Sequence, residues 1–217
     1  MDLNKILPKK DTEKRDYHWS VAIEPDWVQV SLWYVLGDTA HIVATSTPTA
    51  WESDKELIDA VDAALSHVVQ NTDEDIGEPS KSVFGVIDSW VDDGQIQKEH
   101  LDKIKKVCQE LSLSPVGFVV ISEAIANFIK SVEGSPLTGV VLGVSKDFLN
   151  ITVFKTGVVS GNTQVSRSIS VVDDMVEGLT RMNLGDITPS RFVIYNAKKD
   201  EIEEAKQSLV KAHWEDY

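Results

Sequence analysis

The chain has 217 residues, of which 42% are hydrophobic and 26% are charged, the balance of a folded globular protein rather than a disordered one. Its formal net charge of −14 gives a surface that repels phosphate backbones, so nucleic-acid binding is disfavoured. No apolar run approaches the roughly 20 residues of a transmembrane helix, and the charged N-terminus lacks the apolar stretch of a secretory signal. We therefore expect a cytoplasmic protein without a transmembrane segment, brought to the inner face of a membrane only through partners or through segments outside this chain.

Residues 1–17 show no apolar periodicity, and we expect them to form a flexible lead-in. The first half of the fold, residues 18–137, begins with hairpin-linked strands and continues with alternating helices and strands. Ser53 and Glu56 form a capping box that marks the start of the first helix. The expected strands cover residues 19–23, 28–34, 41–44, 82–87 and 117–121, and the expected helices include residues 57–68, 101–111 and 123–130. The two short apolar runs SVFGVI and GFVVI predict strands that are buried on both faces.

The same order then repeats over residues 138–217, the second half of the fold. The expected strands cover residues 139–144, 150–154, 158–165 and 191–195, and the expected helices include residues 172–179 and 202–209. This duplication predicts an α/β fold with two mixed sheets, flanking helices and a shared cleft. The second copy lacks the last strand and helix of the first, so we expect this chain to be one part of a longer polypeptide.

Four stretches resemble the actin-like ATPase superfamily, whose members share a ribonuclease H-like fold. They are VAIEPDWVQVSLW at 21–33, SPVGFVVISEAIANFI at 114–129, VVLGVSKDFLNITVFKTGVVSG at 140–161 and SISVVDDMVEGLTRMN at 168–183. Within the superfamily the pattern is most similar to the bacterial cell-division protein FtsA and the type IV pilus protein PilM. The resemblance implies a duplicated βββαβα architecture with a nucleotide site between the halves.

The first phosphate-binding loop of that superfamily reads roughly Asp-x-Gly-[Ser/Thr], and this chain has Glu24-Pro25-Asp26-Trp27 at that place. Pro25 removes a backbone N–H donor, whereas Asp26 places a negative charge where a phosphate would lie. Two like charges about 4 Å apart repel by roughly 4 kcal/mol at an effective dielectric of about 20. We therefore expect a weakened phosphate loop, with Glu24 in the place of the family's aspartate.

The second phosphate-binding hairpin is also degenerate. The superfamily has Asp-x-Gly-Gly-x-x-Thr-Asp, and this chain has GVSKDFLN over residues 143–150. Lys146 would meet a phosphate as a point charge, and Asn150 ends the motif. The glycine-rich loop that grips the adenosine would follow residue 217. These departures predict no catalytic residues and no cofactor, while Glu24, Asp26, Lys146 and Asn150 remain the candidates for nucleotide binding.

The remaining chemistry-bearing residues form no recognisable site. The histidines lack ligand spacing and Cys108 is the single cysteine, so neither a metal site nor an internal disulfide is predicted, and we expect the thiol in the core. Three of the tryptophans, Trp27, Trp33 and Trp90, are candidates for a role in binding. Most such residues serve as hydrophobic caps of a core, but they are also the candidates for a partner-binding surface, because tryptophan is enriched among interface anchors.

The first functional hypothesis is a non-catalytic actin-like scaffold or interaction domain of a bacterial membrane-associated assembly, of the cell-division or pilus type. Its partners would be proteins, membrane-associated ones among them, or further copies of the chain. The alternative is a divergent actin-like ATPase that binds ATP with Mg²⁺ at the four candidate residues. A third hypothesis, an unrelated duplicated α/β domain that binds a small ligand, would be favoured if the two halves had different strand orders.

Overall fold

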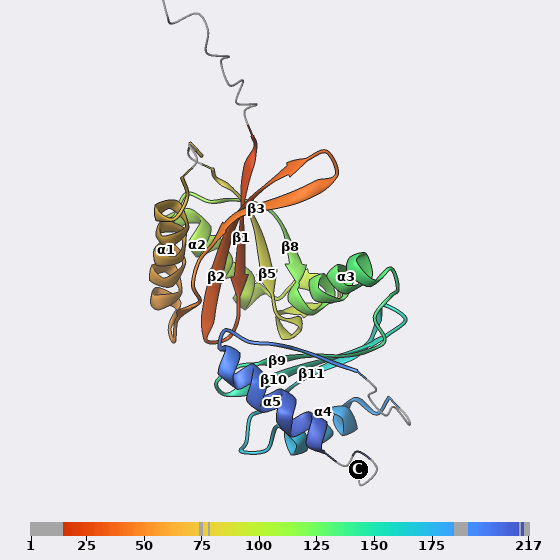
Figure 1. Cartoon of the computed structure of the whole chain (residues 1–217). Coiled ribbons are helices and arrows are strands. Elements are labelled where there is room, and N and C mark those ends of the chain that lie inside the picture. Colours follow the sequence, from red (N-terminus) through yellow and green to blue (C-terminus); the bar gives the residue numbers. More distant parts are fainter. Residues whose placement is uncertain (1–14, 74–75, 78, 185–190, 213, 215–217) are drawn as a thin grey trace, which may run out of the picture.

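The computed structural model describes residues 15–73, 76–77, 79–184, 191–212 and 214, and shows two β-sheets with helices packed against them (Figure 1). Residues 1–14, most of the predicted lead-in, lie outside the described residues. The strands of the first sheet are β1 (Tyr17–Ile23), β2 (Trp27–Leu36), β3 (Thr39–Thr45), β4 (Thr49–Ala50), β5 (Lys81–Val86) and β8 (Ser114–Val120). The main path through it runs β3-β2-β1-β5-β8, with β1, β5 and β8 parallel and β2 antiparallel to both of its long neighbours.

The second sheet repeats this order. Its strands are β9 (Gly139–Val144), β10 (Phe148–Lys155), β11 (Val158–Ser166) and β12 (Phe192–Tyr195). They are arranged β11-β10-β9-β12, with β12 parallel to β9 and the hairpin strands antiparallel. Strand for strand, this matches β3-β2-β1-β5 of the first sheet, so the predicted duplicated α/β architecture is confirmed.

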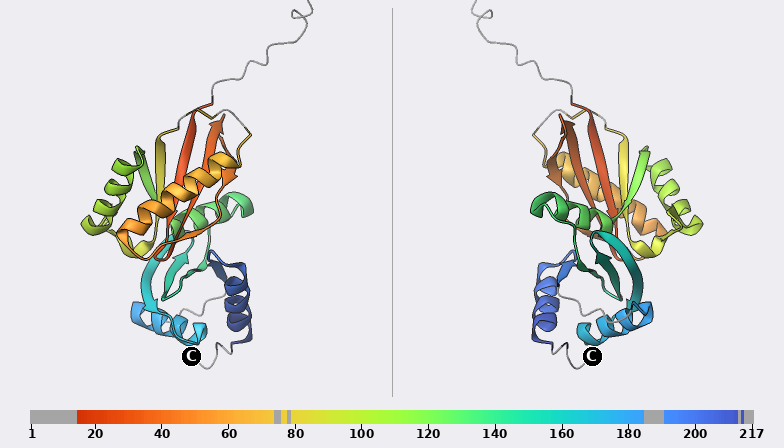
Figure 2. Two further views of the ribbon diagram at one scale, coloured as in Figure 1. Left: turned by 90° about the vertical axis from the view of Figure 1, so that its left-hand side faces the viewer. Right: turned by 90° about the vertical axis from the view of Figure 1, so that its right-hand side faces the viewer.

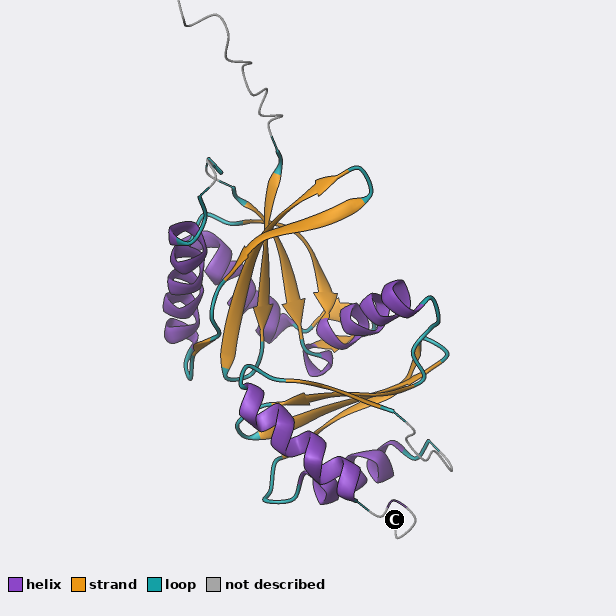
Figure 3. Ribbon diagram, viewed as in Figure 1, coloured by secondary structure: helices purple, strands orange, loops and turns teal. Residues whose placement is uncertain are grey.

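Each sheet has its own helices and its own apolar core. The helices are α1 (Asp54–Gln70), α2 (Lys98–Glu110), α3 (Ile121–Glu133), α4 (Val171–Met182) and α5 (Lys199–Lys211). In the two views of Figure 2, α1 lies in front of the first sheet from one side and α3 from the other. Figure 3 shows α4 and α5 on the side of the second sheet that faces away from the first. The inward side chains of β1, β5 and α1 form one core cluster, and those of β9, β10 and α4 form another.

Helix α3 connects the two cores. Its buried residues Ala126 and Ile129 pack with Val141 and Phe154 of the second sheet in a third apolar cluster. At the end of α3, Glu133 also forms a two-pronged ion pair with Arg191, with N···O distances of 2.6 and 2.7 Å. The helix that completes the first half is therefore also packed against the second.

Local sequence signals account for several element boundaries. Ser53 caps α1 by accepting a hydrogen bond from the backbone N–H of Glu56, as the capping box predicts. The turn between β10 and β11 places Thr156 at φ 53° and Gly157 at φ 77°, the left-handed backbone of a tight hairpin. Cys108 is buried at 8% exposure, where burial raises the pKa of its thiol. Among the described residues, no helix is both long and apolar enough to cross a membrane.

One prediction about burial is wrong. The run GFVVI (residues 117–121) was expected to be buried on both faces, but β8 is an edge strand of the first sheet, and Phe118 and Val119 are 37% and 45% exposed. An apolar run predicts a strand without saying what covers it. The elements that the sequence did not indicate are too short for periodicity to detect: β4, the 3₁₀ turn η2 (Asp88–Trp90), and the ribbon β6 (Val91–Asp92) with β7 (Gln95–Ile96).

The close packing of α4 on the second sheet gives a test of the fold. A Cβ added at Gly178 of α4 would overlap the Ile151 Cδ1 atom and lie 3.2 Å from Thr163 Cγ2. Helix propensity alone predicts that Gly178→Ala stabilises the protein by about 1 kcal/mol. We expect the overlap to dominate, so that the variant loses roughly 1–3 kcal/mol in free energy of unfolding.

Thermal unfolding followed by circular dichroism measures this. For a chain of this size, Tm should fall by roughly 2–4 °C per kcal/mol lost. Gly117→Ala in β8 is the matched control, because an added Cβ there meets nothing within 4 Å. A Gly178→Ala variant with a raised Tm would contradict the packing of α4 described above.

Candidate functional site

The hairpin that follows β1 meets the hairpin that follows β9. These are equivalent positions in the two halves, and both are the loops that the resemblance assigns to phosphate binding. The Asp26 carboxylate accepts a hydrogen bond of 2.9 Å from the backbone N–H of Lys146. The Lys146 ammonium group extends outward to the Glu52 carboxylate at 3.3 Å. An acidic side chain of the first loop thus occupies an N–H donor of the second.

Glu24 lies at the centre of this contact, and its side chain is buried at 2% exposure. Its backbone is fixed twice: its N–H donates to the Trp27 carbonyl at 2.9 Å, and its carbonyl accepts from the Trp51 indole at 3.0 Å. Burial raises the pKa of the Glu24 carboxyl to about 8, and the charges of Asp26 and Asp88 raise it further. Glu24 is therefore largely protonated at neutral pH.

A second buried carboxyl lies beside it. Asp88 begins η2, directly after β5, and is 8% exposed. Its Oδ1 atom accepts a hydrogen bond of 2.8 Å from the Ser122 hydroxyl, and Thr152 of the second half provides another hydrogen-bonding group. Burial raises the pKa of Asp88, although the Ser122 and Thr152 hydroxyls favour its ionised form. The Asp88 side chain thus lies at the boundary between the two halves, bonded to Ser122 of the first and close to Thr152 of the second.

The second half contributes Tyr195 and Asn150 to the same region. The Tyr195 hydroxyl lies near the Glu24 carboxyl, and burial together with that neighbour raises its pKa well above the usual value. The ring packs so closely on Gly143 that a Cβ there would be 2.5 Å from the hydroxyl oxygen. Asn150 is 4% exposed and its side-chain oxygen accepts from Gln164 at 2.9 Å.

Several buried polar side-chain atoms of this region have no hydrogen-bond partner among the described residues. They are Glu24 Oε1, Asp26 Oδ1, Asp88 Oδ2, Asn150 Nδ2 and the Tyr195 hydroxyl. Buried polar groups are nearly always hydrogen-bonded, so such a concentration is typical of a functional site. Within the described part of the chain, no three acidic, histidine or cysteine side chains are grouped closely enough to hold a metal ion.

The nearby cations are directed to other partners. Arg167 donates to the Ser145 carbonyl at 3.0 Å and to Glu201 at 2.8 Å. Lys198 also pairs with Glu201, at 2.8 Å. Because these charges are already paired, as is that of Lys146, they do not neutralise Glu24 or Asp88.

The structure groups the four residues predicted for nucleotide binding and separates the three tryptophans. Asp26 and Lys146 are in contact, with Glu24 and Asn150 buried nearby. The tryptophans differ in exposure. Trp90 is 6% exposed and stacks on His100, with ring centroids 4.3 Å apart. Trp33 stacks on His18 with ring centroids 4.9 Å apart, and Trp27 is half-buried at the start of β2. Partner binding through Trp27 or Trp33 stays a prediction, and Trp90 has little surface to offer.

Sequence reasoning missed Asp88 and Tyr195. A signal was available, because Asp88 comes two residues after β5 and Tyr195 is the last residue of β12. In α/β folds, polar groups at the carboxyl ends of parallel strands meet at the edge where ligands bind. The predicted strand 82–87 already placed an acidic residue at that edge.

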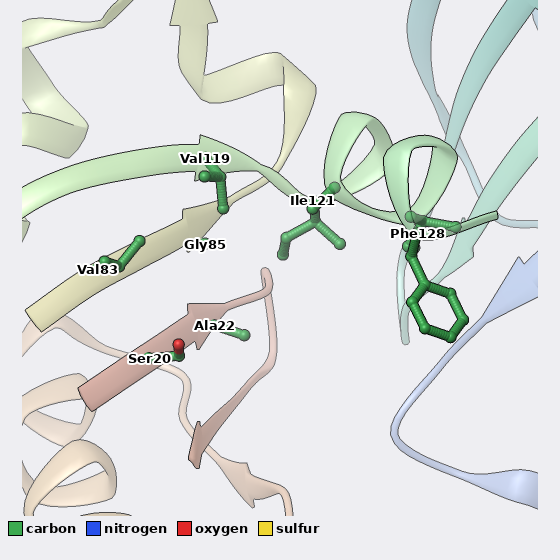
Figure 4. A pocket seen from close by; sticks show the side chains of 9 residues that line it. Ser20, Ala22, Val83, Gly85, Val119, Ile121 and Phe128 are labelled. Atoms are coloured by element: carbon green, nitrogen blue, oxygen red, sulfur yellow. The ribbon is translucent and has the colours of Figure 1, made fainter. Parts of the chain in front are cut away.

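A separate apolar groove lies on the open face of the first sheet, opposite α1 (Figure 4). It has a volume of about 340 Å³ and is lined by Ser20, Ala22, Val83, Gly85, Val119, Ile121, Ala124, Ile125 and Phe128. Its floor comes from β1 and β5 and its wall from α3. Phe128 is 66% exposed at the rim.

Comparison with solved structures places this arrangement among known folds. An exopolyphosphatase from Cytophaga hutchinsonii matches with a TM-score of 0.52 at 10% identity, covering 92% of this chain and 73% of that one. A Bacteroides thetaiotaomicron protein with actin-like ATPase fold and unknown function matches with a TM-score of 0.50 at 11% identity, covering 94% and 92%. The PPX-GPPA enzyme of Aquifex aeolicus has a TM-score of 0.40 at 10% identity, with coverage of 76% of this chain and 60% of its own. No protein-family model and no curated protein sequence matches the chain.

These comparisons correct one prediction. The degenerate loops led us to expect no cofactor, with ATP and Mg²⁺ reserved for the alternative function. That expectation is wrong: the matching structures have an ATPase fold and include an exopolyphosphatase. It was based on loop motifs alone, whereas the region where the two loops meet keeps a set of buried polar side chains, Glu24 and Asp88 among them.

These comparisons support the broader assignment to an actin-like ATPase fold and do not test the specific resemblance to FtsA and PilM. Both halves have the same strand order, the loops after β1 and β9 are in contact, and the Bacteroides structure that covers nearly the whole chain is described as having an actin-like ATPase fold. The chain has the fold of the actin-like ATPase superfamily.

Proposed function

We propose that this chain is a non-catalytic actin-like interaction domain, which binds protein partners instead of hydrolysing nucleotide. The observation that supports this most is the hydrogen bond of 2.9 Å between the Asp26 carboxylate and the Lys146 backbone N–H. In the superfamily that the sequence resembles, the backbone N–H groups of the second hairpin would donate hydrogen bonds to a phosphate. Here one of them is taken by an anion of the chain itself, and that anion would repel an incoming phosphate.

The surrounding charges support the same function. The Lys146 ammonium group pairs with Glu52 at the mouth of the cleft. A transferred phosphoryl group needs cations that neutralise developing charge. The contact between the loops instead carries the Asp26 carboxylate, with the acids Glu24 and Asp88 buried behind it, while the nearby basic side chains are paired with other acids.

A direct assay tests the absence of catalysis. The protein is incubated with ATP or with polyphosphate in the presence of Mg²⁺, and released phosphate is measured over time. We expect release no faster than in a protein-free control. Saturable, Mg²⁺-dependent release that Asp88→Asn abolishes would contradict the proposal and establish the alternative, a divergent actin-like ATPase.

The Asp26 contact itself should be measurable as stability. Asp26→Ala removes a charge-assisted hydrogen bond between the two hairpins, and because the bond is partly exposed we expect a loss of roughly 1 kcal/mol. Asp147→Ala is the matched control, an exposed carboxylate of the same second hairpin. By thermal unfolding, Asp26→Ala should lower Tm by roughly 2–4 °C, with Asp147→Ala unchanged. Equal Tm values for both variants would mean that the contact does not hold the loops together.

The apolar groove is the surface that we propose for a partner. The first sheet has parallel strands β1, β5 and β8, and parallel strands normally have both faces covered. Ser20, Ala22 and Gly85 on the groove floor are small enough to let a helix approach closely. Phe128 and Val132 continue the apolar wall one helical turn apart, each 66% exposed. An amphipathic helix of a partner protein fits this floor and wall.

Changing the rim of the groove should alter its affinity for apolar ligands without affecting the fold. Phe128→Glu introduces a charge at a side chain that is 66% exposed. We therefore expect its free energy of unfolding to change by no more than an ordinary surface substitution does, about 0.5 kcal/mol. Anilinonaphthalene sulfonate, which fluoresces on apolar surfaces, should bind the variant less than half as well. Val210→Glu on α5, at 77% exposure, is the control and should bind the dye as before. Equal dye binding by all three proteins would rule out the groove as the main apolar surface.

The sequence resemblance to FtsA and PilM extends the proposal to a bacterial membrane-associated assembly of the division or pilus type. A net charge of −14 disfavours direct adsorption to an anionic membrane. On this proposal, a protein partner carries the domain to the membrane, and self-association is the other route by which it would build an assembly.

A further inference from the structure

The two halves meet at a buried polar layer that the proposed interaction function does not use. Glu24 and Asp88 of the first half face Tyr195 and Thr152 of the second. Glu24 is 2% exposed, Asp88 is 8% exposed and Thr152 is 1% exposed. This layer reaches the start of α3, where Ser122 donates to Asp88, whereas the apolar cluster that joins α3 to the second half lies further along the helix, at Ala126 and Ile129. Figure 1 shows α3 beside the second sheet.

We propose that the buried carboxyls of Glu24 and Asp88 form a proton-controlled latch, which holds the two halves closed when protonated and lets them separate when ionised. Opening would leave each half folded, because each sheet keeps its own apolar core. The packing of α3 on β9 and the Glu133–Arg191 ion pair would act as the hinge side. The latch would therefore control how far the cleft opens.

The surroundings of Glu24 account for its sensitivity to protons. Burial raises its pKa to about 8, Asp26 and Asp88 raise it by like charge, and the Tyr195 hydroxyl partly opposes the shift. The cations around the cleft are directed elsewhere: Lys146 to Glu52, and Arg167 and Lys198 to Glu201. When Glu24 loses its proton, the resulting charge lies beside two other acids with no cation to pair with.

The direction of the pH effect follows from linkage. The pKa of Glu24 is about 8 in the closed form, against an ordinary value of 4.5. Between these values the closed form keeps a proton that an open or unfolded form releases, so raising the pH favours the open form. Glu24 contributes its full stabilisation of the closed form below about pH 4.5. This contribution decreases as the pH rises through the window and is lost above about pH 8. Asp88 acts in the same direction, because its pKa is also raised.

The experiment measures the distance between the halves. Spin labels are attached at Lys55→Cys on α1 and Gln207→Cys on α5, both exposed, in a Cys108→Ala background that prevents labelling of the core thiol. Distance distributions are recorded by pulsed electron resonance between about pH 4 and about pH 9.5. We expect the mean distance to increase as the pH rises between 4.5 and about 8 and to stay constant above that window, while far-ultraviolet circular dichroism stays unchanged.

Three variants identify the group responsible. Glu24→Gln should open much less than the unmodified protein, because the amide resembles the protonated acid and only Asp88 is left to ionise. Glu52→Gln, a change at an exposed acid that pairs with Lys146, should open like the unmodified protein. Tyr195→Phe removes a group that favours ionised Glu24, so its distance should go on increasing to a higher pH. This variant decides the question if Glu24→Gln does not fold.

Three results would overturn the latch. The first is an unchanged distance in the unmodified protein across the pH range. The second is opening of Glu24→Gln to the same extent as the unmodified protein, or a Tyr195→Phe variant whose distance changes over the same pH range as the unmodified protein. The third is an increase in distance that coincides with loss of secondary structure, which would mean alkaline unfolding of the whole protein.

Discussion

The structure depends on burying the Glu24 carboxyl between two halves that are wound in the same way. A carboxyl group is almost never fully buried unless it is paired or neutral, and here the neighbouring groups are two further acids and a tyrosine. Protonation therefore becomes the condition for close contact. The Trp51 indole and the Trp27 carbonyl fix the backbone of Glu24 in the turn after β1, and its side chain is 2% exposed.

This constraint connects the fold to the proposed function. The loops after β1 and β9 are brought together by the duplication, and in this chain they are joined by the Asp26–Lys146 hydrogen bond. An acidic side chain of the first loop thus contacts the second loop at the place to which the resemblance assigns a phosphate. The open face of the first sheet, with its small-residue floor beside α3, provides the alternative surface for interaction. An adjustable cleft behind that surface would let the state of the latch alter how α3 is presented to a partner.

Much of the fold could be predicted from the sequence because its signals are local. Periodicity placed the strands and helices, the Ser53 capping box located the start of α1, and Thr156-Gly157 located a hairpin. The grouping of Glu24, Asp26, Lys146 and Asn150 followed from the resemblance. What escaped prediction depends on contacts between distant segments: the open face of β8, the burial of Glu24, and the presence of Asp88 and Tyr195 in the cleft. Apolar runs cannot show which faces stay uncovered, and no sequence pattern reports that a carboxyl is neutral.

The most direct measurement is the ionisation of Glu24 itself. Carbon-13 labelling of glutamate carboxyls, with Glu24→Gln used to assign the resonance, allows the titration of this one group to be followed by nuclear magnetic resonance. The structure predicts a pKa of about 8, with a chemical shift that remains that of the protonated acid through neutral pH. A Glu24 resonance that titrates near 4.5, the ordinary value, would mean that the carboxyl is solvated, and would contradict the closed arrangement of the two halves.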